Sequence, residues 1–236
     1  MGRDQQPTQP AAAGTTADRS LRAVTGCTDR DNEDVDHYFS PTPGGADVRR
    51  TVEFHAAGRG FALAASGGVF SAGRLDPGTA VLLRKAILPG PGETGPLLDL
   101  GCGYGPIACV LATVAPLATV WAVDVNDRAR RLTAENAAAL SAADRLCVCD
   151  PADVPGGVRF RQIWSNPPVR VGKDEQHRLL AGWLPRLAPG GTAWLVVSRH
   201  LGGDSLQRWL TGQGWVATRH ASQKGYRVLR VTHPSP

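Results

Sequence analysis

An alternation of short apolar runs with longer helical patterns, which begins after the turn residues 89–92, constrains the fold more than any other feature of the sequence. The apolar runs predict buried strands at residues 97–100, 119–123, 146–149, 160–164 and 194–197. The helical periodicity between them predicts helices at residues 107–115, 128–140 and 174–187. Strands that alternate with helices favour a parallel sheet with helices on both faces, which is a doubly wound α/β fold.

A different pattern closes the sequence. It predicts a short helix at residues 205–210 and strands at residues 215–218 and 226–232. A parallel crossover needs about a dozen residues or more, and only residues 219–225 join these two strands, so they must pair antiparallel. We therefore predict a mostly parallel sheet that ends in an antiparallel C-terminal hairpin.

The N-terminal part divides into two further segments. Residues 1–36 mix Gln, Pro, Ala, Thr and acidic residues without a sustained apolar pattern, so we predict a disordered tail. Residues 37–89 are expected to form an extension that packs on the core domain of residues 90–236.

Three local elements are predicted within the extension. Residues 47–57 are expected to form a short helix, and residues 61–64 are expected to form a hairpin with residues 69–71. A second helix is predicted to run through about Ile87, with Asp76 as its N-cap because Pro follows at the first helical position.

Composition excludes several classes of protein. With 236 residues, of which 42% are hydrophobic, the chain can close a larger core than a disulfide-rich miniprotein. Its five Cys show neither C-x-x-C spacing nor a cluster with His, so we expect reduced thiols in a cytoplasmic protein and no metal site. The polar N-terminus lacks a signal-peptide pattern, and the most apolar run, residues 106–123, is interrupted by Pro116, so we expect no membrane span.

Basic residues gather in the C-terminal half of the sequence. From Arg159 to Arg230 there are ten Arg and two Lys against three acidic residues, which gives a local charge of +9. Such a stretch would bind a polyanion by releasing counterions, as nucleic-acid enzymes do. An Arg-rich composition caused by GC-rich codons would give the same count, so charge alone leaves both interpretations open.

A glycine-rich loop follows the first predicted strand of the core domain. Asp99 precedes a G-x-G-x-G pattern formed by Gly101, Gly103 and Gly105, and a predicted helix comes next. Glycines at this place let backbone N–H groups approach a ligand at the helix N-terminus. Because the carboxylate of Asp99 would repel a pyrophosphate and attract an ammonium, the loop favours S-adenosylmethionine over a dinucleotide.

Two more acidic residues lie at the ends of the next two predicted strands. Asp124, 23 positions after Gly101, can accept hydrogen bonds from both ribose hydroxyls of a nucleoside. Asp150 is placed to approach the adenine amino group. Each alone would be a helix cap or a turn former, which is the interpretation that we give to Asp127 and Asp153. Together the strand-end acids predict a nucleoside site.

The fourth predicted strand ends in Ser165-Asn166-Pro167-Pro168. The two prolines fix the backbone, so that the side-chain oxygen of Asn166 and the carbonyl of Pro167 can accept both hydrogens of an exocyclic amine. Holding that amine in line with a sulfonium methyl group supplies most of the catalysis, and no general base is required. Asn166, Pro167 and Pro168 are therefore the predicted catalytic residues.

Together these segments resemble the small-domain class I methyltransferases, the family that includes the ribosomal small-subunit methyltransferase C group. The resemblance covers about residues 37–232 and rests on residues 37–40, 68–71, 75–79, 99–105, 123–126, 165–173 and 225–228. It implies a seven-stranded Rossmann-like sheet, S-adenosylmethionine as cofactor, and methylation of an exocyclic nitrogen, which for that group is N2 of a guanine in 16S rRNA. The resemblance also implies cofactor contacts by Thr79, Cys102, Val125 and Asn166, in addition to those of Asp99, Gly101, Gly103, Asp124 and Asp150.

Two features depart from the family pattern. Val169 stands where many members have an aromatic residue that stacks on the target base, so either stacking comes from Phe70, Tyr104 or Trp164, or the substrate differs. Many bacterial members also have a second N-terminal domain, whereas this sequence is similar to the short single-domain members. The expected substrate contacts are Phe70, Val169, Arg170 and Lys173, the last two through phosphates or else as solvated loop charges.

The sequence therefore predicts an N-methyltransferase that acts on a guanine amine of ribosomal RNA, with ribosomal RNA or a ribosomal subunit as its partner. Two alternatives stay open. The same Asn-Pro-Pro chemistry would serve a protein glutamine methyltransferase, and a non-catalytic RNA-binding module could retain the fold. The position of a labelled methyl group, on RNA, on protein or on neither, discriminates among the three.

Overall fold

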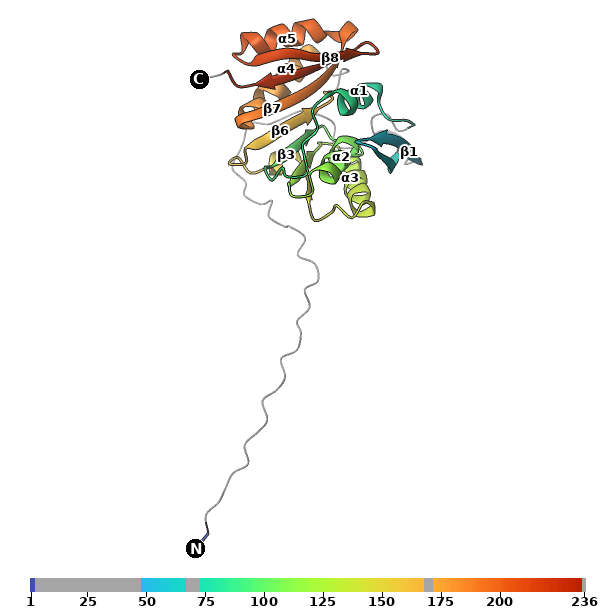
Figure 1. The fold of residues 1–236 in the computed structure, drawn as a ribbon, viewed down its shortest axis with the longest axis vertical. Coiled ribbons are helices and arrows are strands. Elements are labelled where there is room, and N and C mark those ends of the chain that lie inside the picture. Colours follow the sequence, from blue (N-terminus) through green and yellow to red (C-terminus); the bar gives the residue numbers. More distant parts are fainter. Residues whose placement is uncertain (3–47, 67–72, 168–171, 235–236) are drawn as a thin grey trace.

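The computed structural model describes residues 1–2, 48–66, 73–167 and 172–234, and within this part of the chain a seven-stranded sheet forms the centre (Figure 1). The strand order is β5-β4-β3-β6-β7-β9-β8. The strands are β3 (Leu97–Leu100), β4 (Val120–Val123), β5 (Leu146–Cys149), β6 (Phe160–Ser165), β7 (Leu187–Ser198), β8 (Val216–Gln223) and β9 (Tyr226–Thr232). Strands β3 to β7 pair parallel, and β9 pairs antiparallel with β7 and β8. This confirms the predicted doubly wound sheet and its antiparallel C-terminal hairpin.

Helices cover both faces of the sheet because the strands are apolar on both faces. One apolar cluster contains residues of α1 (Pro77–Lys85), α2 (Pro106–Val114) and α3 (Asp127–Ala139), and the other contains residues of α4 (Lys173–Trp183) and α5 (Gly203–Gly212). Successive strand residues alternate between the clusters, so that Leu195 belongs to the second and Val196 to the first. The core therefore has two layers, one on each side of the sheet.

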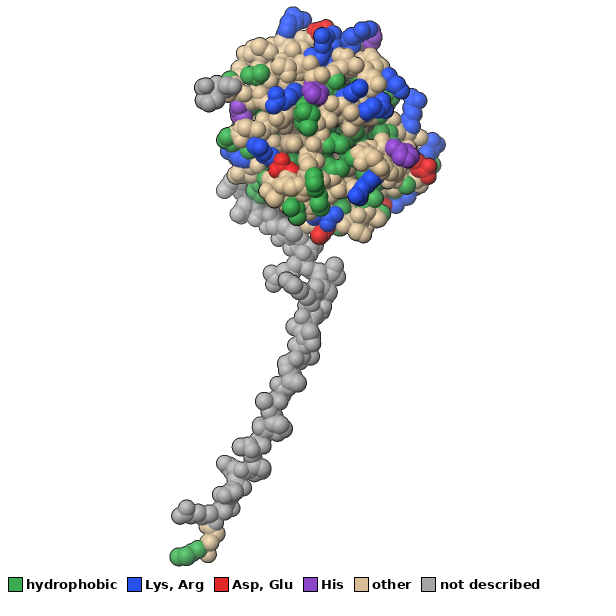
Figure 2. Space-filling model, in the orientation of Figure 1, with side chains coloured by type: hydrophobic (Ala, Val, Ile, Leu, Met, Phe, Trp, Pro, Cys, Tyr) green, Lys and Arg blue, Asp and Glu red, His purple; other side chains and the backbone are tan. Residues whose placement is uncertain are grey.

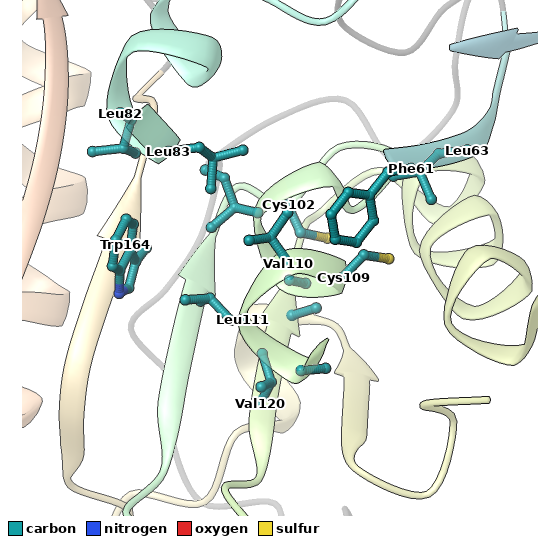
Figure 3. Packing of buried hydrophobic residues seen from close by; sticks show 14 of the residues in the cluster. Phe61, Leu63, Leu82, Leu83, Cys102, Cys109, Val110, Leu111, Val120 and Trp164 are labelled. Atoms are coloured by element: carbon teal, nitrogen blue, oxygen red, sulfur yellow. The ribbon is translucent and has the colours of Figure 1, made fainter. Parts of the chain in front are cut away.

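The first cluster also fixes the N-terminal extension on the core domain. Figure 3 shows Leu82 of α1 near Trp164 of β6, and Phe61 of the extension beside Cys102 and Cys109. These side chains are buried, and Leu82 and Trp164 have no exposed surface. The described part of the extension thus contributes to the same hydrophobic core as the sheet and its helices.

The extension itself differs from the prediction, because the described residues 48–57 of the predicted helix do not form one. Strand β1 (Arg49–Ala56) pairs antiparallel with β2 (Arg59–Ser66). Val52 and Phe54 of β1 are buried while the residues between and around them are exposed, which is the period-two pattern of a half-buried strand. That short alternation is the signal that the helical interpretation overlooked.

The turn of this hairpin also lies elsewhere than predicted. Ala57 and Gly58 have φ angles of 51° and 73°, as the tight two-residue turns of hairpins require. Residues 61–64 consequently pair with β1. Their predicted partner, residues 69–71, lies outside the described residues, as does nearly all of the predicted tail of residues 1–36.

Helix α1 begins as predicted, since the Asp76 side chain accepts a hydrogen bond from the Thr79 backbone N–H and Pro77 is its first residue. The predicted helix of residues 174–187 is too long. Helix α4 ends at Trp183 and a 3-10 turn, Leu184–Arg186, follows, because Pro185 has no N–H to continue the helical ladder. Leu187 then starts β7, which runs to Ser198 and is therefore longer than the predicted strand of residues 194–197.

The structure also bears on the expectations about membrane-spanning helices, metal-binding clusters and the state of the cysteines. Among the described residues, no helix is both long and apolar enough to cross a membrane. The same ranges contain no group of three or more His, Cys, Asp or Glu side chains arranged to bind a metal ion. Four cysteines are described and all are free thiols, namely Cys102, Cys109, Cys147 and Cys149.

Candidate active site

The polar residues singled out in the sequence lie at the carboxyl ends of four neighbouring strands. Asp99 lies in β3, Asp124 follows β4, Asp150 follows β5 and Asn166 follows β6. Since these four strands are adjacent and parallel, their carboxyl ends meet at one edge of the sheet. Ligands of open α/β sheets bind outside this edge.

The glycine-rich loop lies between β3 and α2. Gly101, Gly103 and Gly105 all have positive φ angles, 77°, 58° and 86°, which only glycine adopts readily. A Cβ atom at Gly105 would lie 2.9 Å from the side chain of Thr133 in α3, whereas one at exposed Gly101 would meet nothing within 4 Å. The loop is therefore packed against α3 on one side and open on the other.

Asp99 is fully buried beneath this loop. Its Oδ2 accepts a hydrogen bond of 2.9 Å from the backbone N–H of Ala108, in the first turn of α2. Its Oδ1 is buried and has no hydrogen-bond partner within the described part of the chain. Burial raises the pKa of the Asp99 carboxyl from 3.8 to about 7, although the Ala108 hydrogen bond opposes this. A buried carboxylate oxygen without a donor is a point at which a cationic ligand would be stabilised.

Asp124 connects the glycine-rich loop to the turn after β4. Its Oδ2 accepts from the Gly103 N–H and its Oδ1 from the Asn126 N–H, both at 2.9 Å. Burial raises the pKa of the Asp124 carboxyl, while these two backbone donors lower it. A carboxylate has about four acceptor positions, so each oxygen can still accept a further hydrogen bond. Asn126, rather than Asp127, caps α3 by accepting from Arg128 N and Ala129 N.

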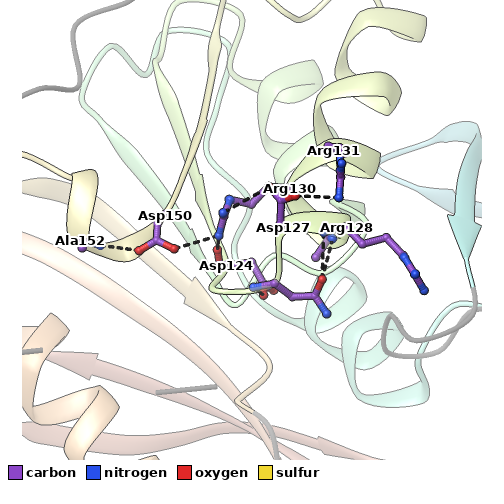
Figure 4. A network of polar contacts seen from close by, with 9 residues as sticks. Asp124, Asp127, Arg128, Arg130, Arg131, Asp150 and Ala152 are labelled. Atoms are coloured by element: carbon purple, nitrogen blue, oxygen red, sulfur yellow. Dashed lines mark hydrogen bonds and ion pairs between the residues drawn. The ribbon is translucent and has the colours of Figure 1, made fainter. Parts of the chain in front are cut away.

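Asp150 is already engaged by the protein on both carboxylate oxygens. Its Oδ1 accepts from Ala152 N at 3.0 Å, and its Oδ2 accepts from Arg130 at 2.9 Å (Figure 4). The same Arg130 nitrogen donates to the backbone carbonyl of Asp124 at 2.6 Å. Arg130 thus joins the ends of β4 and β5. A contact of Asp150 with an adenine amine would have to use a remaining lone pair or displace Arg130.

Sequence reasoning missed Arg130. The available signal was its place in the first turns of the helix that follows Asp124, because helical side chains point back toward the helix N-terminus. An Arg at that position can reach the strand ends that precede the helix. Asp127, one turn earlier, pairs with Arg131 at 2.7 Å and with Arg130 at 3.4 Å.

The remaining predicted cofactor residues differ in what they can offer. The Cys102 side chain is buried and lies 3.5 Å from the Thr133 hydroxyl, while its backbone N–H donates to Val123 O and its carbonyl accepts from Gly105 N. Val125 is half-buried in the turn after β4. Thr79 is buried at the start of α1, and its hydroxyl lies 3.0 Å from Nδ2 of Asn166.

Asn166 is held from one side at the end of β6. Its Nδ2 donates to Oδ1 of Asp76 at 2.7 Å and to the Thr79 hydroxyl oxygen at 3.0 Å. The neighbouring Ser165 hydroxyl donates to the carbonyl of Leu100 at 2.8 Å, which ties the ends of β6 and β3 together. Pro167 is buried. The predicted residues Pro168, Val169, Arg170 and Phe70 lie outside the described residues, and Lys173 is the exposed first residue of α4.

Two of the aromatic residues considered for base stacking cannot serve that purpose in this structure. Trp164 has no exposed surface, packs against Trp194 and donates its Nε1–H to Gln162. Tyr104 is only 2% exposed, and its buried hydroxyl has no hydrogen-bond partner among the described residues. Helices cover both faces of a central strand such as β6, so the side chains of its residues are buried on one face or the other. Although Trp164 is close to Asn166 in sequence, its side chain therefore does not enter the site.

Comparison with known sequences places the chain in a family. A family model described as "Methyltransferase small domain" matches residues 60–230. The uncharacterized protein YbxB of Bacillus subtilis is 29% identical over 198 residues, which are 83% of this chain and 98% of the relative. Ribosomal RNA small subunit methyltransferase C of Hahella chejuensis is 39% identical over 140 residues, and ribosomal RNA large subunit methyltransferase G of Streptomyces avermitilis is 32% identical over 175 residues.

Coverage is unequal between these relatives. The matches span 57% and 70% of this chain but only 39% and 43% of the two ribosomal RNA methyltransferases, so the chain spans less than half of their length. Among solved structures, the T. thermophilus 16S rRNA N2 G1207 methyltransferase in complex with AdoMet and guanosine has a TM-score of 0.68 at 24% identity. It covers 80% of this chain, and this chain covers 52% of it. On these matches and on its sheet topology, the chain belongs to the methyltransferase small domain family and is a class I methyltransferase whose cofactor is S-adenosylmethionine.

Proposed function

We propose that this protein transfers a methyl group from S-adenosylmethionine to the exocyclic N2 amine of a guanine in 16S ribosomal RNA. The observation that carries the proposal is Asn166, whose Nδ2 is bound by Asp76 and Thr79 so that its oxygen is left as an acceptor at the carboxyl end of β6. The names of the related ribosomal RNA methyltransferases supply the substrate class.

The residues at the sheet edge fit S-adenosylmethionine. The buried, unpartnered Oδ1 of Asp99 suits the ammonium group of the cofactor, and the open side of Gly101 leaves room for a ligand close to the backbone. Asp124 retains acceptor positions for the two ribose hydroxyls. Asp150 and Val125 would border the adenine, with Arg130 holding Asp150 in place.

Asn166 and Pro167 would orient the substrate amine. Bound S-adenosylmethionine supplies an electrophilic methyl group. The Asn166 Oδ1 and the Pro167 carbonyl accept the two N–H groups of the amine, which fixes the direction of its nitrogen lone pair. Because an aromatic amine is a weak nucleophile whose lone pair must be aligned, this positioning accounts for most of the expected rate increase.

Exposed basic residues support an RNA substrate at the same edge. Ser165 pairs with Leu195, so β7 extends past the end of β6 and Arg199 follows it. The backbone N–H of Arg199 donates to the carbonyl of Gly225, next to Lys224. Lys173, Arg199 and Lys224 are all exposed, and we call them the basic edge. On the face shown in Figure 2, Lys and Arg side chains outnumber Asp and Glu.

Part of the basic character predicted from the sequence is structural and does not support RNA binding. The Arg186 guanidinium lies over the rings of Phe160 and Trp183, at 5.6 and 4.8 Å from their centres. Arg227 is buried and pairs with Asp204, and Arg178 pairs with Glu175. Asp204 and Glu175 are already subtracted in the count of +9, so these two pairs leave the net count unchanged. The three Arg are nevertheless engaged within the protein, and the basic edge is the smaller set that the proposal uses.

The experiment that tests the function incubates the protein with tritiated S-adenosylmethionine and, separately, 30S subunits, 50S subunits, naked 16S and 23S rRNA, and ribosomal protein. We expect label in the 30S or 16S sample, on N2 of one guanine after nuclease digestion. Label confined to 23S rRNA would show that the substrate belongs to the large subunit and not to the small one. Label on a glutamine would show that the substrate is a protein. Cofactor binding without any label would contradict an enzymatic function.

Replacing Asp124 with Ala is expected to weaken S-adenosylmethionine binding by about 1–3 kcal/mol, which is about 5- to 150-fold. The substitution removes the ribose acceptor and leaves Gly103 N–H and Asn126 N–H without a partner. Isothermal titration calorimetry measures the change. Asp144→Ala is the matched control, because this carboxylate is 75% exposed and pairs with its neighbour Arg145. Equal affinities of the two variants would remove Asp124 from the site.

Substituting all three residues of the basic edge with Ala is expected to reduce the salt dependence of rRNA binding. The logarithm of the binding constant falls as log salt rises, and each lost phosphate contact makes this slope shallower by about 0.7–0.9. The slope of the triple variant should therefore be shallower by about 2 to 3. Filter binding between 50 and 200 mM KCl measures the slope, and S-adenosylmethionine affinity should not change. The control replaces exposed Arg59, Arg161 and Arg208, which lie on β2, at the opposite end of β6, and on α5. A larger loss of slope in the control variant would indicate that RNA binds at another surface of the protein.

A further inference from the structure

We propose that Asp76 is a positioning residue, whose carboxylate determines which end of the Asn166 side-chain amide faces the substrate. The proposal rests on the function proposed above, in which Asn166 Oδ1 accepts a hydrogen bond from the methylated amine. Asp76 lies 90 positions earlier in the sequence, in the extension, and the sequence indicated only that it caps α1. It would act through Asn166 and would not contact the substrate.

The contact between the two side chains is short and shielded. Nδ2 of Asn166 lies 2.7 Å from Oδ1 of Asp76, and Asp76 is only 9% exposed. The Thr79 hydroxyl oxygen, at 3.0 Å, is the second partner of the same nitrogen. Among the described residues, the hydrogen bonds of the Asn166 side chain thus all use one end of the amide, and its oxygen remains for another partner.

The chemistry of a carboxylate selects this orientation. The oxygen and the nitrogen of an amide have nearly the same size, so packing alone distinguishes the two flipped states poorly. An ionised carboxylate can only accept hydrogen bonds. A flipped Asn166 would place its oxygen against Oδ1 of Asp76, and two acceptors at this distance repel each other. The flipped state would also present N–H groups, rather than an acceptor, to the substrate amine.

The position of Asp76 is itself fixed by the start of α1. The same Oδ1 accepts the N-terminal capping hydrogen bond from Thr79 N at 2.9 Å. A Cβ at Gly78 would lie 3.0 Å from this oxygen and 3.0 Å from Cε1 of Tyr226, so the first turn of α1 is tightly packed around it. One oxygen atom therefore serves two groups, the helix N-terminus and the catalytic amide, and it cannot shift toward one without leaving the other.

Because Asp76 both caps α1 and holds Nδ2 of Asn166, three substitutions of Asp76 can distinguish a structural role from a positioning role. Asp76→Asn keeps an acceptor oxygen at the same reach, so it can both cap α1 and hold Nδ2 of Asn166. Asp76→Ser keeps a good N-cap, but its hydroxyl is shorter and can donate as well as accept, so it no longer selects the amide orientation. Asp76→Ala loses both functions. A purely structural role predicts that activity follows stability, whereas a positioning role predicts that Ser and Asn variants of similar stability differ in activity.

The experiment measures kcat and KM for rRNA methylation, S-adenosylmethionine affinity and the midpoint of thermal unfolding for the three variants. We expect Asp76→Ser to lower kcat by about 10- to 100-fold, the effect of losing a hydrogen bond to a charged group, with KM and cofactor affinity close to wild type. Asp76→Asn should recover most of this loss at the same unfolding midpoint. A wild-type kcat for Asp76→Ser, in a preparation where Asn166→Ala is inactive, would overturn the positioning role and leave the proposed function intact.

A second measurement does not depend on the substrate. The Asn166 side-chain NH₂ signals in a ¹H–¹⁵N spectrum, identified by their absence in Asn166→Ala, should exchange slowly with water in wild type and in Asp76→Asn. They should exchange at least about tenfold faster in Asp76→Ser, because its shorter side chain no longer supplies an acceptor oxygen that protects them. If wild-type protein methylates no RNA, the proposed function is wrong, and the exchange rates alone then decide the positioning role. Equal exchange in all variants would overturn it.

Discussion

Asn166→Ala is expected to lower kcat for methyl transfer by about a hundredfold or more, the usual cost of removing one positioned hydrogen-bonding group from a transition state. The substitution removes the acceptor that aligns the substrate amine and leaves the glycine-rich loop and the strand-end acids in place. Affinity for S-adenosylmethionine should therefore stay close to wild type. Single-turnover methylation and calorimetry separate the two quantities.

The matched control for this variant is Gln162→Ala. Gln162 is a half-buried amide of the same strand, β6, and accepts from Trp164 Nε1–H at 2.8 Å, away from the carboxyl end of the strand. It should retain methyl transfer although it loses a hydrogen bond. If Asn166→Ala and Gln162→Ala were equally active, the reacting amine would have to be held by other groups, and the assignment of the catalytic residues would be wrong.

The parallel core could be predicted from the sequence because its strands are apolar on both faces. Runs such as residues 97–100 and 194–197 have no amphipathic alternative in a chain of this length, and a short link before residues 226–232 leaves only antiparallel pairing. The same argument located the carboxyl ends of the strands. Asp99, Asp124, Asp150 and Asn166 consequently lie at one sheet edge, as the sequence indicated.

The elements that could not be predicted are those that depend on contacts distant in the sequence. Strand β1 alternates over few residues, and its turn uses Ala57 with a positive φ, which local preferences disfavour. Its pairing with β2 is stabilised by α3, where the Asn136 side chain bonds both the N–H and the carbonyl of Ala64. No pattern within residues 47–57 reports that partner.

The candidate site shows the same division. Which residue types end each strand is a local property, and the sequence supplied it. Which side chain contacts another is not a local property of the sequence. The contact of Arg130 with Asp150 and the contact of Asp76 with Asn166 therefore appeared only in the structure. The first contact joins residues that are 20 positions apart in the sequence, and the second joins residues that are 90 positions apart. The stacking role considered for Trp164 failed for the complementary reason, because sequence position does not state which layer a strand residue faces.

The second large effect concerns Asp99, whose burial raises its carboxyl pKa from 3.8 to about 7. The folded protein without cofactor therefore retains a proton that the unfolded chain releases above pH 3.8. Since the folded state binds more protons, the free energy of unfolding falls as pH rises from about 4 to about 7 and then levels off. The rise in pKa corresponds to about 4 kcal/mol at the upper limit. Asp99→Asn removes this contribution and should make the cofactor-free protein more stable at pH 8 than wild type.

Cofactor binding should reverse the preference for the protonated form. An ammonium group beside the unpartnered Oδ1 of Asp99 favours the carboxylate, so the complex forms with release of the proton. Between pH 7 and pH 5 the affinity for S-adenosylmethionine should fall by up to about tenfold per pH unit. An α-amino group has a pKa of about 8, so the cofactor itself stays protonated in this window.

Calorimetry in two buffers of different ionisation enthalpy measures the protons released. At pH 6 we expect close to one proton for wild type and none for Asp99→Asn, whose side-chain oxygen can still accept from Ala108 N–H and keep the start of α2 in place. The variant should also bind the cofactor more weakly than wild type at pH 7.5, where the lost charge is felt most. Because Asp124 and Asp150 are unchanged in this variant, proton release that persisted in it would show that another group titrates, and the ammonium would have to be placed away from β3.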